Sequence, residues 1–283
     1  MNYELIDSGD GRRLERFGDY ILDRPDPQII WKKNLPPTRW GEANARFAER
    51  WINPAPGTAA GASKTVPERW EMEHRGIKFW AKLAPFKHTG VFPEQSSQWE
   101  YINEVITQST NNPINVLNLF AYTGIATLFA AKAGAKVTHV DASKPAITWA
   151  NENRDLNRMQ DVPIRWIVDD ATKFTEREAK RGVKYDAIIM DPPVYGHAPN
   201  GEPWDFNKDF PRLLDNCKKI LSDNPLFVLV NAYAISSSSI TLANTLQGAF
   251  GELGGTIENG ELTLKETSAG RLLSTGIWAK WSK

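Results

Sequence analysis

The sequence predicts an α/β protein in which a doubly wound, mostly parallel sheet follows a smaller β-rich module. The first observation is a series of short apolar runs, each followed by a helical or loop segment, which is typical of βαβ units. These runs are residues 115–120, 136–141, 164–168, 187–190 and 226–231. The second observation is Gly124, which stands between the first run and the helix-forming residues 125–132 and indicates a tight turn from a buried strand into a helix. We expect the module to span residues 1–90 and the sheet domain residues 91–283.

Composition limits the classes of function. Of 283 residues, 41% are hydrophobic, which suffices for a large domain and a small module to bury a core. Lysine plus arginine and aspartate plus glutamate number 34 each, so any contact with nucleic acid needs a local basic patch. A single cysteine and four scattered histidines predict neither internal disulfides nor a metal site. Because the N-terminus is charged and no long apolar run occurs, we expect a cytoplasmic protein without a signal peptide or membrane span.

The N-terminal module is predicted from short segments broken by turns. Strands are expected at residues 3–6 and 20–22, a turn at 8–11, and loops at 24–27 and 35–38.

Later in the module, apolar residues three or four apart predict a helix over residues 40–51, and residues 53–63 are typical of a flexible linker. Residues 69–74 and 77–83 flank Arg75 and Gly76 as a predicted hairpin. Five tryptophans are expected to form the core of the module, with stacking on nucleic-acid bases as the alternative. They are Trp31, Trp40, Trp51, Trp70 and Trp80.

The sheet domain begins with an amphipathic helix, predicted from apolar residues at helical spacing in residues 99–106 and started by residues 92–95. Ser143 predicts the start of a later helix, and Thr175 with Glu178 predicts a capping box at the start of another. After a helix near residues 239–250, residues 261–265 and 271–281 are expected to form two final strands at an antiparallel edge.

Polar residues gather at the ends of four predicted strands. The first strand leads into residues 118–124, the second ends at Asp141, Asp169 and Asp170 follow the third, and Asp191 follows the fourth. Taken singly, each carboxylate has a structural alternative as a helix cap, a solvent-facing residue or part of a rigid turn. Because the carboxyl ends of parallel strands meet at one edge of a sheet, together they predict a nucleoside cofactor site.

The first turn narrows the choice of cofactor. A dinucleotide needs the pattern GxGxxG to admit its pyrophosphate, whereas the turn NLFAYTGIA has one glycine. A cofactor with an adenosine but no phosphates fits better, which favours S-adenosylmethionine. Asp141 is then expected to accept hydrogen bonds from both ribose hydroxyls, and Asp169 and Asp170 to lie near the adenine amino group.

Several motifs resemble one family. NLFAYTG, VDAS, the AxxN pattern at residues 150–153, DDA and MDPP are similar to those of class I methyltransferases of the bacterial 23S ribosomal RNA type, from about residue 88 onward. The resemblance implies a seven-stranded Rossmann-like sheet with a reversed last strand and methylation of cytosine C5 or guanine N7. It implies that residues 120–124 hold the methionine part of S-adenosylmethionine, Asp141 the ribose and Asp170 the adenine. The residues expected at the cofactor are Gln95, Asn118, Phe120, Ala121, Tyr122, Thr123, Gly124, Asp141, Ala142, Ser143, Asp169, Asp170, Ala171 and Asp191.

The sequence departs from the family pattern at two places. The family has arginines around a glutamine after residues 88–90; here Gln95 is kept, but Ser96 and Trp99 stand at the arginine positions. Members that act on C5 have a cysteine after the fifth strand, where this chain has Asn-Ala-Tyr-Ala at residues 231–234. Cys217, the one thiol, is expected on the buried side of a helix over residues 209–221 and therefore to be inert. Because C5 methylation requires a thiolate, we expect transfer to a nitrogen.

The acceptor side of the site is expected after the fourth strand. Asp191, Pro192 and Pro193 border the acceptor in the resembled family, and their oxygens suit its amino hydrogens, while Tyr195 suits stacking on a flipped base. Residues 197–206 are expected to form a lid, with the alternative that Trp204 and Phe206 only anchor this loop. Methylation of RNA, ribosomal RNA above all, is the favoured function. A small-molecule or protein methyltransferase and a catalytically silent RNA-binding or ribosome-assembly factor are the alternatives.

Overall fold

The computed structural model describes residues 1–53, 65–197, 202–233 and 235–283. The chain forms two compact units, Met1–Ser96 with Thr263–Leu273 and Ser97–Leu262 with Ser274–Lys283. Most of the predicted linker, residues 198–201 of the predicted lid and Ala234 lie outside the described residues.

The N-terminal unit is built on a five-stranded sheet in the order β1-β2-β3-β4-β5. Strands β1 to β3 form an antiparallel meander, β3 and β4 run parallel, and β4 and β5 pair antiparallel. The elements are β1 (Tyr3–Gly9), β2 (Arg12–Phe17), β3 (Tyr20–Pro25), α1 (Pro37–Trp40), β4 (Ala45–Phe47) and β5 (Trp51–Ile52). The predicted meander is therefore present, with longer strands than expected.

Strand β2 was not predicted because its sequence, RRLERF, is mostly charged. In the structure, Glu15 is fully buried and accepts hydrogen bonds from two nitrogens of Arg24 at 2.7 and 2.8 Å. The Arg13 Nε atom lies 3.7 Å from a Glu15 oxygen. A charged sequence forms an inner strand here because its buried charges face charges of opposite sign.

The helix predicted over residues 40–51 is wrong. The short helix α1 ends at Trp40. The Asn44 backbone N–H donates to the Ile21 carbonyl, and the Asn44 Oδ1 accepts from the Ile21 N–H, both at 2.7 Å. Because these bonds draw the following residues onto the edge of β3, the Phe47 ring contacts the Trp51 ring across the β4–β5 pair and not along a helix.

The predicted hairpin is confirmed. Strands β6 (Arg69–His74) and β7 (Ile77–Lys82) pair antiparallel around Arg75 and Gly76, whose φ angles of 50° and 73° are typical of a type I′ turn.

Two of the five tryptophans are buried in the N-terminal unit. The indole N–H of Trp40 donates to Asp7, and that of Trp70 donates to the Phe17 carbonyl. These two side chains serve the core of the unit.

The C-terminal unit contains a seven-stranded sheet in the order β10-β9-β8-β11-β14-β16-β15. Its first five strands in this order run parallel, and β16 is antiparallel to β14. This confirms the doubly wound sheet with a reversed last strand and puts the topological switch point between β8 and β11. The strands are β8 (Asn115–Leu119), β9 (Lys136–Asp141), β10 (Ile164–Val168), β11 (Ala187–Met190), β14 (Phe227–Ala232), β15 (Thr256–Lys265) and β16 (Leu272–Ser282).

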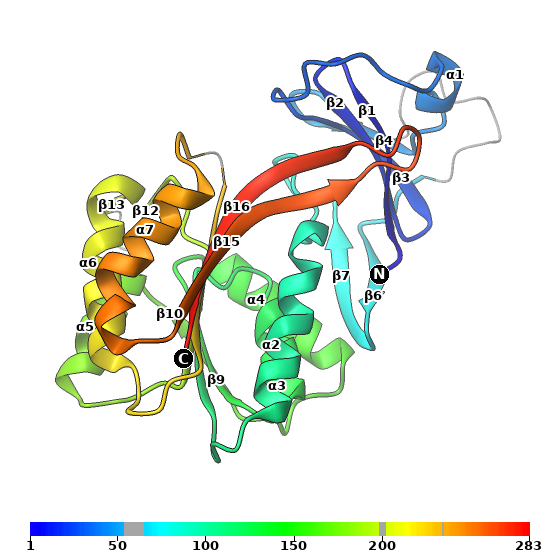
Figure 1. Ribbon diagram of the computed structural model, residues 1–283. Helices are drawn as coiled ribbons and strands as arrows, with labels where there is room; N and C mark the ends of the chain where they lie inside the picture. The colour runs from blue at the N-terminus through cyan, green and yellow to red at the C-terminus, as the bar shows by residue number, and fades with distance from the viewer. Residues whose placement is uncertain (54–64, 198–201, 234) are drawn as a thin grey trace. The chain divides into compact units, whose positions relative to one another are not determined.

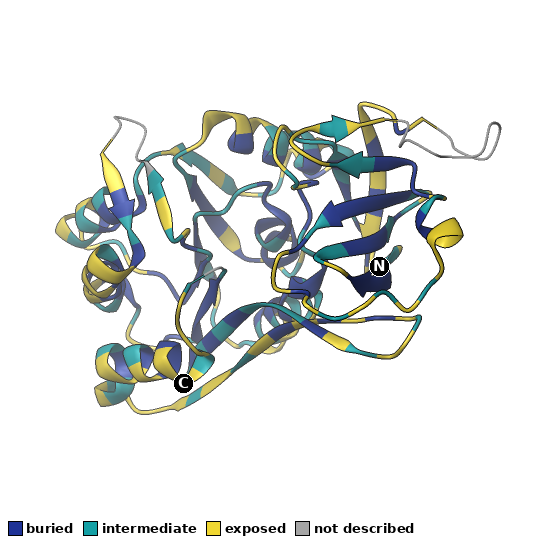
Figure 2. Cartoon of the chain, turned by 90° about the horizontal axis from the view of Figure 1, so that it is seen from above, coloured by how far each residue is buried: buried dark blue, intermediate teal, exposed yellow. Residues whose placement is uncertain are grey.

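Helices cover both faces of this sheet (Figure 1). One layer is α2 (Ser96–Gln108), α3 (Ile125–Lys132) and α4 (Lys144–Leu156); the other is α5 (Ala171–Lys180), α6 (Phe206–Ile220) and α7 (Ser239–Phe250). In the first layer, Trp99 stacks on Phe129 with ring centroids 5.8 Å apart. The second layer shares one apolar cluster with Val228 and Val230 of β14. Figure 2 shows the buried residues in dark blue, and every residue of β11 and β14 is among them.

One helix start was predicted correctly and one was not. The Ser143 Oγ accepts from the Ala146 N–H at 3.3 Å and caps α4. The capping box at Thr175 is wrong, because α5 already begins at Ala171, where the Asp170 Oδ1 accepts from the Lys173 N–H at 2.8 Å. Thr175 therefore lies inside the helix, and its hydroxyl donates to a backbone carbonyl of the preceding turn.

Candidate functional site

The turn after β8 has a strained backbone that is held by hydrogen bonds. Phe120 and Tyr122 have φ angles of 52° and 47°, a left-handed conformation that costs a non-glycine residue roughly 1–2 kcal/mol. The Ala121 N–H donates to the Val140 carbonyl of β9 at 3.1 Å, and the Gly124 N–H donates to the Ala121 carbonyl at 3.0 Å. Strain held in place by such bonds is typical of turns that present their backbone to a ligand.

Gly124 serves packing inside the protein. Its φ angle is 77°, and a Cβ atom there would lie 2.9 Å from the Ala150 Cβ of α4 and 3.3 Å from the His139 ring. The backbone at this glycine therefore closely approaches helix α4 and strand β9.

Asp141, at the end of β9, is the side chain that links the first two strand ends. Its Oδ2 accepts from the Tyr122 N–H and its Oδ1 from the Ser143 N–H, both at 2.8 Å. Burial raises the pKa of Asp141, and the two backbone hydrogen bonds oppose that rise. Since each carboxylate oxygen has a second lone pair, this fixed carboxylate can also accept from the two hydroxyls of a ribose.

A series of hydrogen bonds between buried side chains lies next to this turn. The Asn118 Nδ2 donates to the Thr127 Oγ1 at 3.0 Å, and that hydroxyl lies 3.0 Å from the His139 Nδ1. Because Asn118 supplies a proton to the hydroxyl oxygen, the hydroxyl proton is assigned to the bond with His139. Burial lowers the pKa of His139 to about 3, so the ring is neutral and accepts this bond. Sequence reasoning missed Thr127 and His139, because the folding of α3 back onto β8 brings Thr127 to Asn118 and the pairing of β8 with β9 brings His139 there.

The carboxylates after β10 have partners within the protein. Asp170 caps α5, and the Asp169 Oδ1 accepts from the Asp170 N–H at 2.9 Å while its Oδ2 pairs with Arg177. Ala171 is buried at the start of the helix. The structural alternative of helix capping thus applies to Asp170, and contact with an adenine stays a prediction for both carboxylates.

The Asp191-Pro-Pro motif lies beside the first turn. The Asp191 N–H donates to the Leu119 carbonyl of β8 at 3.4 Å, so the ends of β8 and β11 adjoin. Pro192 is buried, Pro193 is exposed, and the Tyr195 side chain is 72% exposed on strand β12 (Tyr195–His197). The structure therefore brings Asp191 to the edge that holds Asn118 and Asp141.

The loop after this motif is anchored by aromatic side chains. Trp204, on β13 (Pro203–Asp205), and Phe206 are both buried, and Phe206 stacks on Phe210 with centroids 4.5 Å apart. The Trp204 ring lies 5.1 Å from that of Phe120. Both side chains therefore anchor the loop, and a lid motion stays a prediction.

Gln95 is the one predicted site residue in the N-terminal unit. It ends the short 3₁₀ helix Pro93–Gln95, where it is buried. The other predicted residues belong to the C-terminal unit and stand at or next to the carboxyl ends of its strands.

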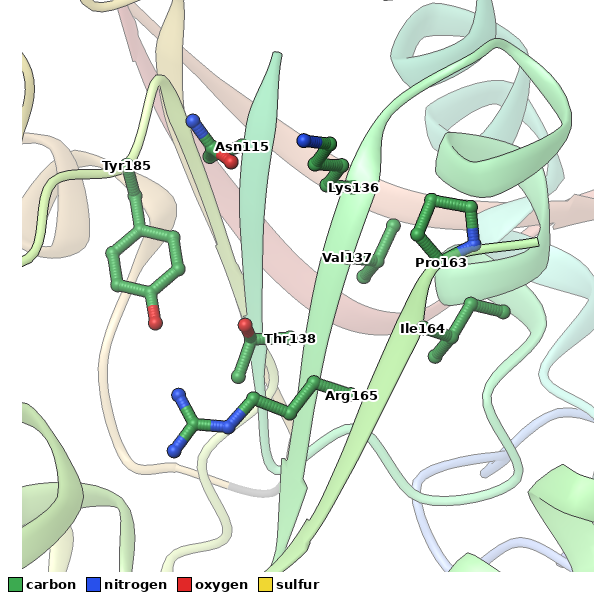
Figure 3. Close-up of a pocket in the computed structure, with 8 residues that line it drawn as sticks. All are labelled: Asn115, Lys136, Val137, Thr138, Pro163, Ile164, Arg165 and Tyr185. Atoms are coloured by element: carbon green, nitrogen blue, oxygen red, sulfur yellow. The ribbon is translucent and has the colours of Figure 1, made fainter. Parts of the chain in front are cut away.

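A hollow of about 330 Å³ lies at the opposite edge of the sheet (Figure 3). Asn115, Lys136 and Ile164, which line it, are the first residues of β8, β9 and β10. Tyr185, also in its wall, donates to Glu178 of α5 at 2.7 Å. Because ligands of doubly wound sheets bind at the carboxyl ends of the strands, we assign this hollow no part in cofactor binding.

Among the described residues, no group of three or more His, Cys, Asp and Glu side chains is arranged to hold a metal ion. No helix in the described ranges is long and apolar enough to cross a membrane.

Comparisons with known proteins agree with this geometry. A family model described as S-adenosylmethionine-dependent methyltransferase matches residues 49–250. The crystal structure of the SAM-dependent methyltransferase from Agrobacterium tumefaciens is similar at a TM-score of 0.94 and 39% identity, covering 100% of this chain and 90% of that chain.

Two curated relatives are the ribosomal RNA large subunit methyltransferases K/L of Pseudoalteromonas translucida (strain TAC 125) and Shewanella frigidimarina (strain NCIMB 400). They are 34% and 33% identical over 162 and 161 residues, which is 56% of this chain in each case. The aligned part is 22% of each relative, so this chain corresponds to a fraction of their length.

Proposed function

The chain belongs to the S-adenosylmethionine-dependent methyltransferase family, and from this premise we propose that it methylates a nitrogen of an RNA base, with ribosomal RNA the favoured substrate. The enzyme uses S-adenosylmethionine, which supplies a methyl group on a positively charged sulfur. The proposal extends this activity to one class of acceptor in the cytoplasm.

The residues at the strand ends fit the cofactor. The observation that carries this fit is Asp141, whose two oxygens are already fixed by the backbone of Tyr122 and Ser143 and still offer lone pairs to a ribose. The strained turn at residues 120–124 would hold the methionine part, and Asn118, Thr127 and His139 keep that turn in place. This support is preorganised, so little reordering is needed when the cofactor binds.

We assign the acceptor to the Asp191-Pro-Pro segment. Transfer from a sulfonium is an in-line displacement, so the protein must aim the acceptor lone pair at the methyl group and exclude water. The Pro193 carbonyl is held in place by a hydrogen bond from Trp204, and Asp191 and the Pro192 carbonyl are the proposed partners of the acceptor's amino hydrogens. Tyr195 is exposed enough to stack on a base.

Two observations support a nitrogen of RNA as the acceptor. The curated relatives that the chain matches are named as methyltransferases of ribosomal RNA. At the end of β14 the chain has Ala232 and Tyr233 and no thiol, and its one cysteine, Cys217, is fully buried in α6. A nitrogen lone pair needs no covalent enzyme intermediate, only orientation.

The test is to incubate the purified protein with labelled S-adenosylmethionine and RNA from cells that lack the gene. Nucleosides of the product are then identified by mass spectrometry. The proposal predicts one N-methylated nucleoside in ribosomal RNA that is missing from those cells and restored in the assay. Label in protein or in a small molecule, with none in RNA, would refute it.

A further inference from the structure

The buried amide of Gln98 in α2 and the buried amide oxygen of Asn231 at the end of β14 lack hydrogen-bond partners among the described residues. Gln98 is 8% exposed, and neither its Oε1 nor its Nε2 has a partner. Asn231 is 3% exposed, and its Oδ1 has none. Buried polar groups are almost always satisfied, so two such amides near one site indicate that a ligand completes them.

Asn231 stands next to the Asp191 motif on the helix α2 face of the sheet. Side chains alternate along β14, and those of Val228 and Val230 pack in the cluster with α6 and α7. Phe227 and Asn231 therefore point to the other face, where the Phe227 ring contacts Tyr101 of α2 at 5.3 Å. Met190 of β11 pairs with Val230 of β14. The next residues, Asp191 and Asn231, therefore lie at the same level of the sheet.

Gln98 lies in the first turn of α2, on the same face of the sheet. It shares the buried side of α2 with Ile102 and Ile106. Two neighbouring side chains fix how α2 is turned on the sheet. Trp99 stacks on Phe129 of α3 to one side, and the Tyr101 ring contacts Phe227 of β14 on the other. Helix α2 leads into the first residue of β8, so its first turn, which contains Gln98, lies toward the carboxyl ends of the strands.

We propose that Gln98 and Asn231 recognise the edge of the acceptor base, an inference that rests on the proposed function. The Gln98 amide presents an N–H donor beside a carbonyl acceptor, which matches a base edge that presents an exocyclic amine beside a ring nitrogen. The Asn231 Oδ1 accepts a further amino hydrogen. Both groups are neutral, so neither needs a counter-charge in the buried site. The ligand class is thus an amino-bearing nucleobase, positioned between α2 and the Asp191-Pro-Pro edge.

The test uses Gln98→Met and Asn231→Leu, which keep the size of each side chain and remove its polar atoms. The probe is ribosomal RNA from cells that lack the gene. We expect kcat/KM for this RNA to fall at least tenfold in each variant, while calorimetry gives a Kd for S-adenosylmethionine within threefold of wild type. The melting temperature should hold or rise, because the free protein loses no hydrogen bond at these atoms.

Asn216→Leu is the matched control. Asn216 is 6% exposed in α6 and its Nδ2 also has no partner among the described residues, but it lies in the helix layer on the other face of the sheet. This variant should keep the kcat/KM of wild type.

Four results would overturn the assignment. A Kd for S-adenosylmethionine that weakens as much as kcat/KM would mean that the amides hold the cofactor. A melting temperature that falls by several degrees would mean that they have structural partners. Wild-type activity in both variants would remove their role in recognition while leaving RNA methylation intact. A wild-type protein that binds S-adenosylmethionine but methylates no RNA would overturn the proposed function as well.

Discussion

The indole Nε1 of Trp204 lies 2.7 Å from the carbonyl oxygen of Pro193 and donates a hydrogen bond to it. The same indole contacts Phe120, which belongs to the strained turn after β8. One side chain therefore holds both the backbone of the proposed acceptor motif and the turn proposed for the cofactor.

Trp204→Phe should lower kcat clearly while lowering the free energy of unfolding only a little. The substitution keeps an aromatic ring but removes the donor, a loss of about 1 kcal/mol for a single neutral hydrogen bond. Because the Pro193 backbone is then less firmly placed, kcat should fall roughly tenfold, as small misplacements in a reacting geometry do. Phe206→Leu, at another buried anchor of the loop, is the control and should lower the melting temperature with a smaller loss of kcat. Equal losses of kcat in the two variants would contradict a role for the Pro193 bond.

Asp141→Ala should weaken the binding of S-adenosylmethionine. Hydrogen bonds to a charged group contribute roughly 1.5–3 kcal/mol, so Kd measured by calorimetry should rise about tenfold to 150-fold. Asp155→Ala is the control for lost charge, because Asp155 is an exposed carboxylate that pairs with Arg154 at the end of α4. An unchanged Kd in the Asp141 variant would contradict the assignment of the ribose to this residue.

Asp191→Ala and Tyr195→Ala should abolish turnover and leave cofactor affinity nearly intact. Both residues follow β11 and are proposed to face the acceptor. Tyr195→Phe, which keeps the ring for stacking, should retain most of the activity, and neither Tyr195 variant should change the melting temperature because the side chain is 72% exposed. If affinity for S-adenosylmethionine falls together with turnover, these residues serve the cofactor instead.

The sheet was predictable from the sequence because its inner parallel strands β8, β11 and β14 are short apolar runs that are buried on both faces. The gathering of the carboxylates at one edge of the sheet was predictable, because parallel strands have their carboxyl ends at the same edge. By contrast, β2 is charged, and its burial depends on Glu15 meeting Arg24 from a different strand. The false helix over residues 40–51 has the right apolar spacing, but the pairing of Asn44 with Ile21 outweighs it. His139 was missed for the same reason, since strand register places it beside Asn118 of a different strand.

The N-terminal unit should lose stability in acid through Glu15. Burial alone would raise the pKa of this carboxyl, but the charges of Arg13 and Arg24 outweigh burial and lower the pKa to about 2. The stabilisation is complete above the ordinary pKa near 4.5 and is lost as the pH falls toward about 2. At pH 7, Glu15→Gln should cost about 3–5 kcal/mol, because it leaves buried arginine charge uncompensated.

The measurement for Glu15 is the melting temperature as a function of pH. The gap between wild type and Glu15→Gln should be widest at neutral pH and should narrow below pH 4.5, because protonation removes the charge that the variant already lacks. A gap that stays constant down to pH 2 would contradict the ionic role of Glu15.

Cys217→Ala should leave methyl transfer within a few-fold of wild type. Carbon 5 of cytosine is a poor nucleophile, so its methylation needs a thiolate that adds to the base and forms a covalent intermediate. Cys217 is the one thiol of the chain, and it is fully buried in α6 among apolar residues of the helix layer that faces away from α2. Burial raises the pKa of this thiol, so almost no thiolate forms near neutral pH.

The product and the adduct test the same conclusion about Cys217. The assay with ribosomal RNA should yield no 5-methylcytidine, and RNA that contains 5-fluorocytidine should form no covalent complex with the protein, since no thiolate is present to attack the ring. Iodoacetamide should leave the folded protein unmodified and should label Cys217 only after unfolding. This result would show that burial itself keeps the thiol unreactive, whether or not a cytosine is bound nearby. A protein–RNA adduct that disappears in Cys217→Ala would show that this thiol reaches the substrate and that the acceptor is carbon.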